Sequence, residues 1–190
     1  MTWQRMQIWK PSASTAHISR HTRQARLPRE GAPKASEKAP QNVSPRNEEH
    51  QCIGVSRGGK STKIHAVVDA LGNPIHVQLS PGNVNDVTVA QQLLESIQLQ
   101  PGTTVLADKA YGKWALREYI AERGADFCIP PKINESDPWF VDWSLYKERH
   151  LIENFFLKLK EFRRVATRFD KLADRFLAFV LLASVRILLA

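Results

Sequence analysis

Cysteine is scarce in this chain, and no apolar run is long enough to cross a membrane. The 190 residues include two cysteines, Cys52 and Cys128, which provide neither a disulfide framework nor a metal-ligand spacing and favour a reducing compartment. The N-terminus lacks the apolar segment of a secretory signal. The most apolar stretch, residues 176–190, is shorter than the roughly 20 residues of a membrane helix and contains Arg186, so we expect a buried helix there.

Acidic residues are outnumbered by basic ones, which favours a polyanionic partner. The chain has 27 Lys and Arg against 19 Asp and Glu, for a net charge of +8. Nine of the basic residues and four of the acidic ones fall in residues 1–50, which are rich in Pro and Ser and show no lasting helical or strand period. We expect this stretch to be a basic, mostly disordered arm that lies on nucleic acid, or a leader without function, followed by one domain over residues 51–190.

Alternating strand and helix patterns after residue 60 predict an α/β domain with a mixed sheet and flanking helices. Period-two alternation and turn residues mark a hairpin, and short apolar runs mark the later strands. No convincing strand precedes residue 62. The expected strands cover residues 62–68, 75–79, 103–106 and 126–129, and the expected helices cover residues 85–97, 113–122, 144–164 and 169–189.

A glycine-rich segment, GVSRGGKS at residues 54–61, matches the phosphate-binding loop pattern G-x4-G-K-S. That loop binds a nucleoside triphosphate only where a buried strand precedes it and a helix follows it. The residues that follow here, TKIHAVVD, have a strand pattern. We therefore expect a flexible entry into a strand, with Arg57, Lys60 and Lys63 facing DNA, in preference to a nucleotide-hydrolysing site.

The segment YKERHLIENFFLKLK, residues 146–160, gathers polar side chains of complementary chemistry on one side of a predicted helix. At about 100° per residue, Tyr146, Arg149, Glu153 and Lys160 share a narrow stripe. The carboxylate can ligate a hard cation and the two cations can hold backbone phosphates. A solvated face of an ordinary amphipathic helix is the alternative. Apolar residues form a different face that can bury itself in a core: Leu145, Ile152, Phe155, Leu159 and Phe162.

A second carboxylate, Asp108, comes directly after the short apolar strand expected at residues 103–106. The carboxyl end of a buried strand is a common place for a functional side chain, although an aspartate there can equally cap the following helix. Three histidines, His65, His76 and His150, have no metal-ligand spacing. We expect them to be surface or packing residues, with His65 and His76 facing each other across the hairpin.

The spacing Y-x2-R-x3-E-x6-K resembles the signature of a branch of the DDE transposases of bacterial insertion sequences. The segments SRGGKSTKIHAVVD, VLADKAY, CIPPK and RRVATRFDK resemble the same family, and together they span residues 53–172. The resemblance implies an RNase H-like fold and a DNA transposase that cuts and joins insertion-sequence ends. It also implies Mg²⁺ or Mn²⁺ as cofactor, terminal repeats and target DNA as partners, no membrane, and a bacterial cytoplasmic location at the nucleoid when bound.

Within this resemblance, Asp108 looks like the second catalytic carboxylate and Glu153 like the third, and both would ligate metal. The resemblance further implies that Arg149 and Lys160 contact phosphates and that Tyr146 positions DNA or packs beside Glu153. Three carboxylates in such enzymes hold two metal ions that activate the attacking oxygen and stabilise the leaving one.

The first carboxylate of the family pattern has no counterpart in this chain. Its place on an early strand corresponds to Ala13-Ser14-Thr15, and the first aspartate, Asp69, opens an expected turn. We therefore expect an N-terminally truncated or altered transposase whose first strand is incomplete or missing and whose catalysis is defective. A non-catalytic DNA-binding remnant or regulator is the alternative, and a homodimer is left open.

Overall fold

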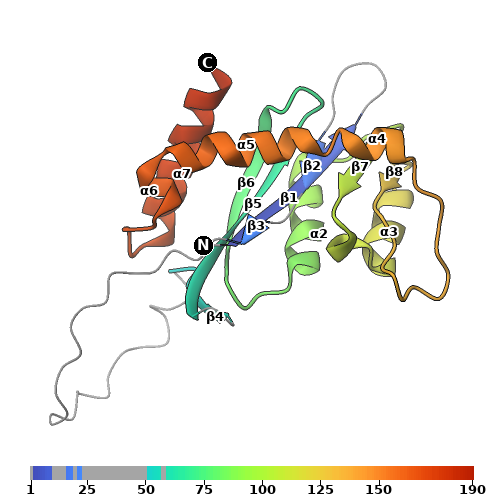
Figure 1. Ribbon diagram of the computed structural model, residues 1–190, viewed down its shortest axis with the longest axis horizontal. Coiled ribbons are helices and arrows are strands. Elements are labelled where there is room, and N and C mark those ends of the chain that lie inside the picture. Colours follow the sequence, from blue (N-terminus) through green and yellow to red (C-terminus); the bar gives the residue numbers. More distant parts are fainter. Residues whose placement is uncertain (1, 10–15, 19–20, 23–50, 57–58) are drawn as a thin grey trace, which may run out of the picture.

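A computed structural model describes residues 2–9, 16–18, 21–22, 51–56 and 59–190, with the backbone alone for the first three segments. One mixed sheet forms the centre, and helices cover both of its faces (Figure 1). The α/β class with flanking helices is therefore confirmed. The strands are β1 (Thr2–Trp9), β2 (Ala16–Ile18), β3 (His21–Thr22), β4 (Gly54–Ser56), β5 (Gly59–Val68), β6 (Pro74–Pro81), β7 (Thr104–Ala107) and β8 (Asp126–Cys128).

The strand β5 lies inside the sheet and is buried on both faces from residue 61 to residue 68. It pairs antiparallel with β6 and parallel with β1, while β7 pairs parallel with β8. The hairpin turn between β5 and β6 is held by Asp69, whose Oδ1 accepts hydrogen bonds from the Leu71 and Asn73 amides at 2.9 and 2.8 Å. Asp69 is thus a turn residue, as expected.

Three strands lie in the stretch expected to be a disordered arm, so that expectation was wrong for those residues. The strand β1 runs parallel to β5 over Thr2–Arg5 and antiparallel to β7 over Met6–Trp9, and β2 runs parallel to β7. The expectation that no strand precedes residue 62 was wrong for the same reason. A central position satisfies backbone N–H and C=O groups on both edges, which stabilises even a strand with a weak sequence pattern. The rest of residues 1–50 lies outside the described part.

One face of the sheet carries α2 (Asp86–Ile97) and α3 (Trp114–Ala121). The helix α2 is capped by Asn85, whose Oδ1 accepts a hydrogen bond from the Val87 amide at 3.2 Å. A short 3₁₀ turn, η1 (Lys109–Tyr111), separates β7 from α3. The core on this face is formed by buried residues of β5, α2, β7 and α3, including Val67, Leu93, Leu94, Val105, Tyr111 and Ile120.

The opposite face carries α4 (Trp143–Lys147), α5 (His150–Glu161), α6 (Arg163–Ala166) and α7 (Ala173–Leu188). A single helix over residues 144–164 was expected. The backbone of Glu148 and Arg149 stays helical between α4 and α5, which follow one line in Figure 1, whereas Phe162 is extended with ψ 107° and ends α5. Buried residues of α5 and α7 pack on β5 and β6: Ile152, Phe155, Phe156, Leu159, Phe176, Val180 and Ala183.

The apolar C-terminal stretch was expected to form a buried helix, and this is correct for one side of α7 only. Phe176, Val180 and Ala183 lie in the core, whereas Leu182 and Val185 are exposed. None of the helices among the described residues combines the length and the apolar character needed to span a membrane. Leu172 is extended with ψ 136° and starts α7 at Ala173, a few residues later than the sequence suggested.

Candidate active site

The Asp108 side chain emerges at the carboxyl end of β7, whose four residues are all buried. Asp108 itself is half-buried. Its Oδ1 accepts a hydrogen bond from the Ala110 amide at 3.4 Å and so caps η1. That distance is longer than the usual range for an amide donor, and only one carboxylate oxygen is engaged in the cap. Asp108 thus lies at the end of a buried strand and also caps the turn that follows, which are the two settings that the sequence allowed.

The Glu153 side chain lies in the first turn of α5, beside Arg149. Arg149 Nη2 and Glu153 Oε1 are 2.8 Å apart, and the Arg149 guanidinium lies 5.4 Å from the centre of the Tyr146 ring. The buried residues beneath α5 fix the helix, and Tyr146 packs edge-on against Trp143 with ring centres 5.7 Å apart. The predicted stripe therefore forms over Tyr146, Arg149 and Glu153. Lys160 follows about two turns later and is half-buried.

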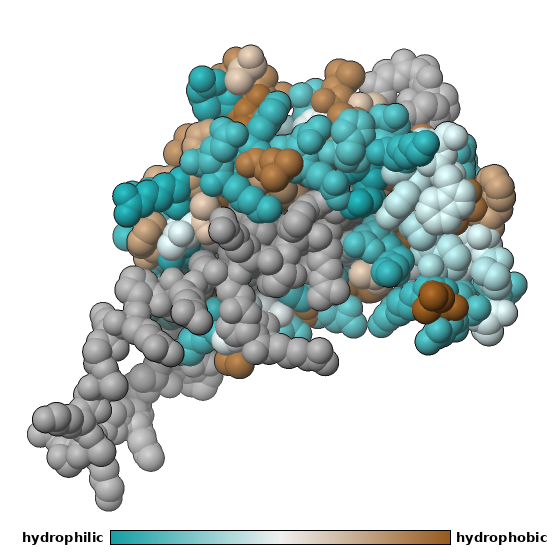
Figure 2. All heavy atoms as spheres, viewed as in Figure 1, coloured by the Kyte–Doolittle hydropathy of each residue, from teal (hydrophilic) through white to brown (hydrophobic). Residues whose placement is uncertain are grey.

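The Tyr146 phenol connects the two carboxylates electrostatically. Burial raises the pKa of Tyr146, and the Arg149 guanidinium lowers it, while the negative charges of Asp108 and Glu153 raise it further. Both carboxylates thus act on one hydroxyl group, although they belong to different elements. The outward face seen in Figure 2, along which α5 runs, is largely hydrophilic, with a few separate apolar patches.

The Lys63 side chain points inward, so the expectation that it faces DNA was wrong. Lys63 Nζ lies 2.6 Å from Asp86 Oδ1 and 2.7 Å from the Val84 carbonyl oxygen, and the Lys63 and Asp86 side chains are 10% and 11% exposed. The cause is the central position of β5, which buries both faces of the strand. Lys60 is exposed near the start of β5, and Arg57 lies outside the described residues.

The glycine-rich segment forms a hairpin and does not precede a helix. The strands β4 and β5 pair antiparallel, with Gly54 opposite Ser61, and β5 continues to Val68. There is no helix N-terminus to receive a triphosphate, so the preference for a strand entry over a nucleotide-binding loop is confirmed.

Histidine contributes no metal centre within the described residues. His65 is fully buried, its Nε2 lies 2.7 Å from Ser80 Oγ, and burial lowers its pKa to about 3. It stands opposite Gln78, and not His76 as expected, because the hairpin register pairs His76 with Val67. In the described parts of the chain, no three His, Cys, Asp or Glu side chains are grouped so that they could hold a metal ion.

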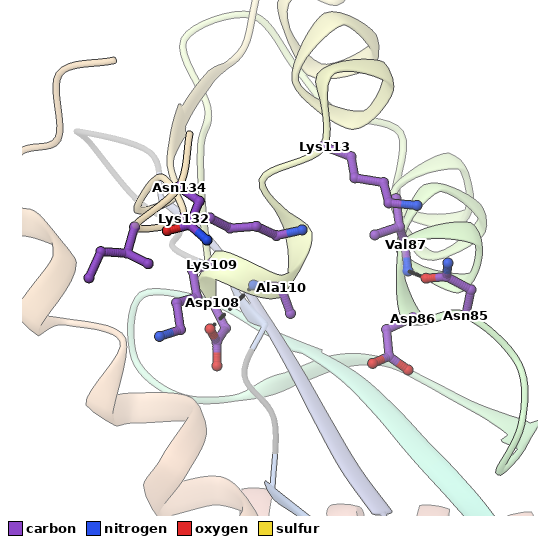
Figure 3. A pocket seen from close by; sticks show the side chains of 10 residues that line it. Asn85, Asp86, Val87, Asp108, Lys109, Ala110, Lys113, Lys132 and Asn134 are labelled. Carbon is purple, nitrogen blue, oxygen red and sulfur yellow. Dashed lines mark hydrogen bonds between the residues drawn. The ribbon is translucent and has the colours of Figure 1, made fainter. Parts of the chain in front are cut away.

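A cavity of about 630 Å³ beside Asp108 was missed by sequence reasoning. It lies between η1, the start of α2 and the loop after β8 (Figure 3). The sequence signal that could have indicated this cavity is the presence of Lys109 in the DKAY segment and of Lys132 in the IPPK segment. The polar residues that line the cavity are Asn85, Asp86, Asp108, Lys109, Lys113, Lys132 and Asn134.

Residues 38–188 match the family model described as a transposase DDE domain. The chain belongs to this family. A Brucella ovis protein named as the transposase for insertion sequence element IS6501 is 44% identical over 124 residues, which are 65% of this chain and 94% of that relative. A Burkholderia cepacia protein named as the transposase for insertion sequence element IS402 is 32% identical over 133 residues, 65% of this chain and 61% of that relative. No solved structure matches significantly.

This membership confirms the resemblance to DDE transposases of insertion sequences. The matched range begins at residue 38, inside the stretch expected to form the arm. The division at residue 50 stays a prediction, as do the roles of the individual site residues.

Proposed function

We propose that this DDE transposase-family chain acts on insertion-sequence ends by metal-dependent phosphoryl transfer in an RNase H-like domain. The observation that carries the proposal is the packing of Leu145 and Tyr146 against the buried cluster that contains Leu106, which brings the helix of Glu153 to the strand that ends at Asp108. Its DNA partners would be the terminal repeats and a target duplex, met at the nucleoid of a bacterial cytoplasm. Gel filtration with and without DNA tests whether the acting form is a homodimer.

The cationic residues of the site would bind the DNA backbone. Arg149 both pairs with Glu153 and lies beside Tyr146, so its guanidinium can orient the carboxylate and place a positive charge near a phosphate. Lys160 lies further along α5, and Lys60 and Arg57 belong to the glycine-rich segment at residues 54–61. We assign phosphate contacts to all three residues. Tyr146 would position the DNA strand next to Glu153.

Asp108 and Glu153 fit a hard divalent cation because both offer carboxylate oxygens. Mg²⁺ is commonly held by one or two carboxylates together with water and substrate phosphates, so these two residues suffice for one ion. A Mg²⁺ or Mn²⁺ ion bound there would supply Lewis-acid stabilisation of charge on the scissile phosphate. The chain's own contribution is to hold the two carboxylates on rigid elements, β7 and α5, beside the tyrosine.

A defect in catalysis is part of the proposal. No aspartate precedes Asp69, and the Asp69 oxygens are engaged in the turn, with Oδ2 accepting from Asn73 Nδ2 at 3.0 Å. Asp86 is held by Lys63 at 2.6 Å. With one carboxylate fewer than a two-metal site requires, we expect little strand transfer by this chain alone.

A non-catalytic DNA-binding role is the second candidate. It is favoured by the lack of any three-residue metal-ligating group among the residues that the structure describes, together with the net charge of +8. Such a protein would bind DNA with strong salt dependence and would not cut it.

Nicking of a duplex that carries the matching terminal repeats, with Mg²⁺ or Mn²⁺, tests both roles. A residual catalytic function predicts slow metal-dependent nicking that is abolished by Asp108→Asn and by Glu153→Gln. Glu95→Gln is the matched control, because it removes one negative charge from an exposed position near the end of α2, on the sheet face opposite α5, and should keep the nicking rate. Binding without nicking would support the second role, whereas rapid strand transfer would contradict the proposed defect.

A further inference from the structure

We propose that the cavity beside Asp108 binds the sugar-phosphate backbone of the DNA strand adjoining the cut site, with Lys109, Lys113 and Lys132 as its phosphate contacts. This inference rests on the proposed function and names residues that neither the sequence pattern nor the relatives' names assign. The three lysines line the same cavity of about 630 Å³ as Asp108, so a strand whose phosphate reaches Asp108 continues directly into it.

The lysines approach the cavity from different walls. Lys109 follows Asp108 in η1, Lys113 precedes α3 and reaches toward the start of α2, and Lys132 extends from the loop after β8 (Figure 3). All three side chains are exposed. Spread positions of this kind suit successive phosphates of one strand better than a single free phosphate ion.

The charge balance of the cavity favours an anion. Of the two carboxylates that line it, Asp86 is already neutralised by Lys63 at 2.6 Å, which leaves Asp108 against three ammonium groups. None of the three lysines forms an ion pair with a carboxylate in the described part of the chain. The N-terminus of α2 also lies in the wall, and its exposed peptide dipoles add to the positive potential.

The walls of the cavity are fixed by packing, so the backbone positions that carry the lysines are set before any ligand arrives. Trp139 Nε1 donates to the Ile129 carbonyl oxygen at 2.7 Å, and the Arg117 guanidinium lies 3.6 Å from the centre of the Trp139 ring. A Cβ on Gly112 would come within 3.4 Å of Trp139, so the turn before α3 and the loop after β8 are in close contact. A preorganised site loses less entropy on binding.

The salt dependence of DNA binding measures the phosphate contacts directly. Each contact to duplex DNA contributes about 0.9 to the slope of log affinity against log salt concentration. Replacing all three lysines (K109Q/K113Q/K132Q) should therefore reduce the slope for a fluorescent random-sequence duplex by about 2.7. A fourfold rise in salt concentration should then weaken DNA binding by the wild type about 40 times more than DNA binding by the variant. The control K158Q/K171Q/R186Q removes the same charge from three exposed positions: Lys158 on α5, Lys171 in the loop before α7, and Arg186 on α7. It should keep the wild-type slope.

Amine acetylation of the wild-type chain gives an independent answer that needs no substitution. We expect bound duplex to protect Lys109, Lys113 and Lys132 from acetylation, as read by mass spectrometry, and to leave Lys158 and Lys171 reactive. A triple variant with the wild-type slope and unprotected lysines would overturn this inference and leave the proposed function standing. Equal protection by a deoxynucleoside monophosphate would overturn the strand assignment. A wild-type chain that binds no duplex would contradict the proposed function, and the inference with it.

Discussion

Removing the Lys63 ammonium should strongly destabilise the fold, because it leaves the Asp86 carboxylate nearly buried without its partner. The two groups are 2.6 Å apart, and their side chains are only 10% and 11% exposed. Loss of one member of such a pair costs about 3–5 kcal/mol in the free energy of unfolding. Asp86 borders the cavity, where water can reach it, so we expect the lower end, about 3 kcal/mol, for Lys63→Met.

Chemical and thermal denaturation of four proteins form the test: the wild type, Lys63→Met, Asp86→Leu and the double variant. Each single change should lower the melting temperature by about 6–12 °C, taking about 2–4 °C per kcal/mol for a domain of this size. The double variant removes both charges and should be less destabilised than the sum of the single changes. Single costs below about 1 kcal/mol, or simple additivity, would refute the buried pair.

Two further predictions concern buried groups. Arg168→Met should cost about 3 kcal/mol or more in denaturant unfolding, because the buried guanidinium donates to Thr62 Oγ1 and, at 2.6 Å, to the Gln51 carbonyl oxygen, and hydrogen bonds from a charged group contribute about 1.5–3 kcal/mol each. These bonds tie β5 and the chain before β4 to the segment before α7. Arg175→Gln, at an exposed position of α7, should cost under about 1 kcal/mol, and equal costs would refute the tie. Burial raises the pKa of the Cys128 thiol to about 11. Its alkylation by iodoacetamide should therefore be slow at neutral pH, and the rate should rise about tenfold per pH unit as the pH approaches this pKa. Fast alkylation at neutral pH would contradict the burial of Cys128.

The sequence was informative where a local pattern decides the structure. The turn at Asp69 and the apolar side of α5 each depend on residues within a few positions of one another, and both were predicted. The break at Phe162 was missed because a helical period continues through it in the sequence, whereas its extended backbone is set by the packing of α6.

Long-range arrangement explains the remaining differences. Residues 2–9 join the sheet by backbone pairing with β5 and β7, which no local pattern reveals. Lys63 was expected outside because β5 was treated as a half-exposed strand, but neighbours on both faces bury it. The cavity lysines look like ordinary surface residues one at a time, and only the fold brings them around Asp108.

Fe²⁺-dependent cleavage of the polypeptide tests most directly whether Asp108 and Glu153 jointly hold a divalent ion. With Fe²⁺ in place of Mg²⁺, ascorbate and peroxide generate radicals that cut the backbone close to the ion. We predict cuts near residue 108 and near residue 153 in the same protein, with both lost in Asp108→Asn and both kept in Glu95→Gln, which changes an exposed position near the end of α2. Cuts near one residue alone, or cuts that persist in Asp108→Asn, would contradict a shared site.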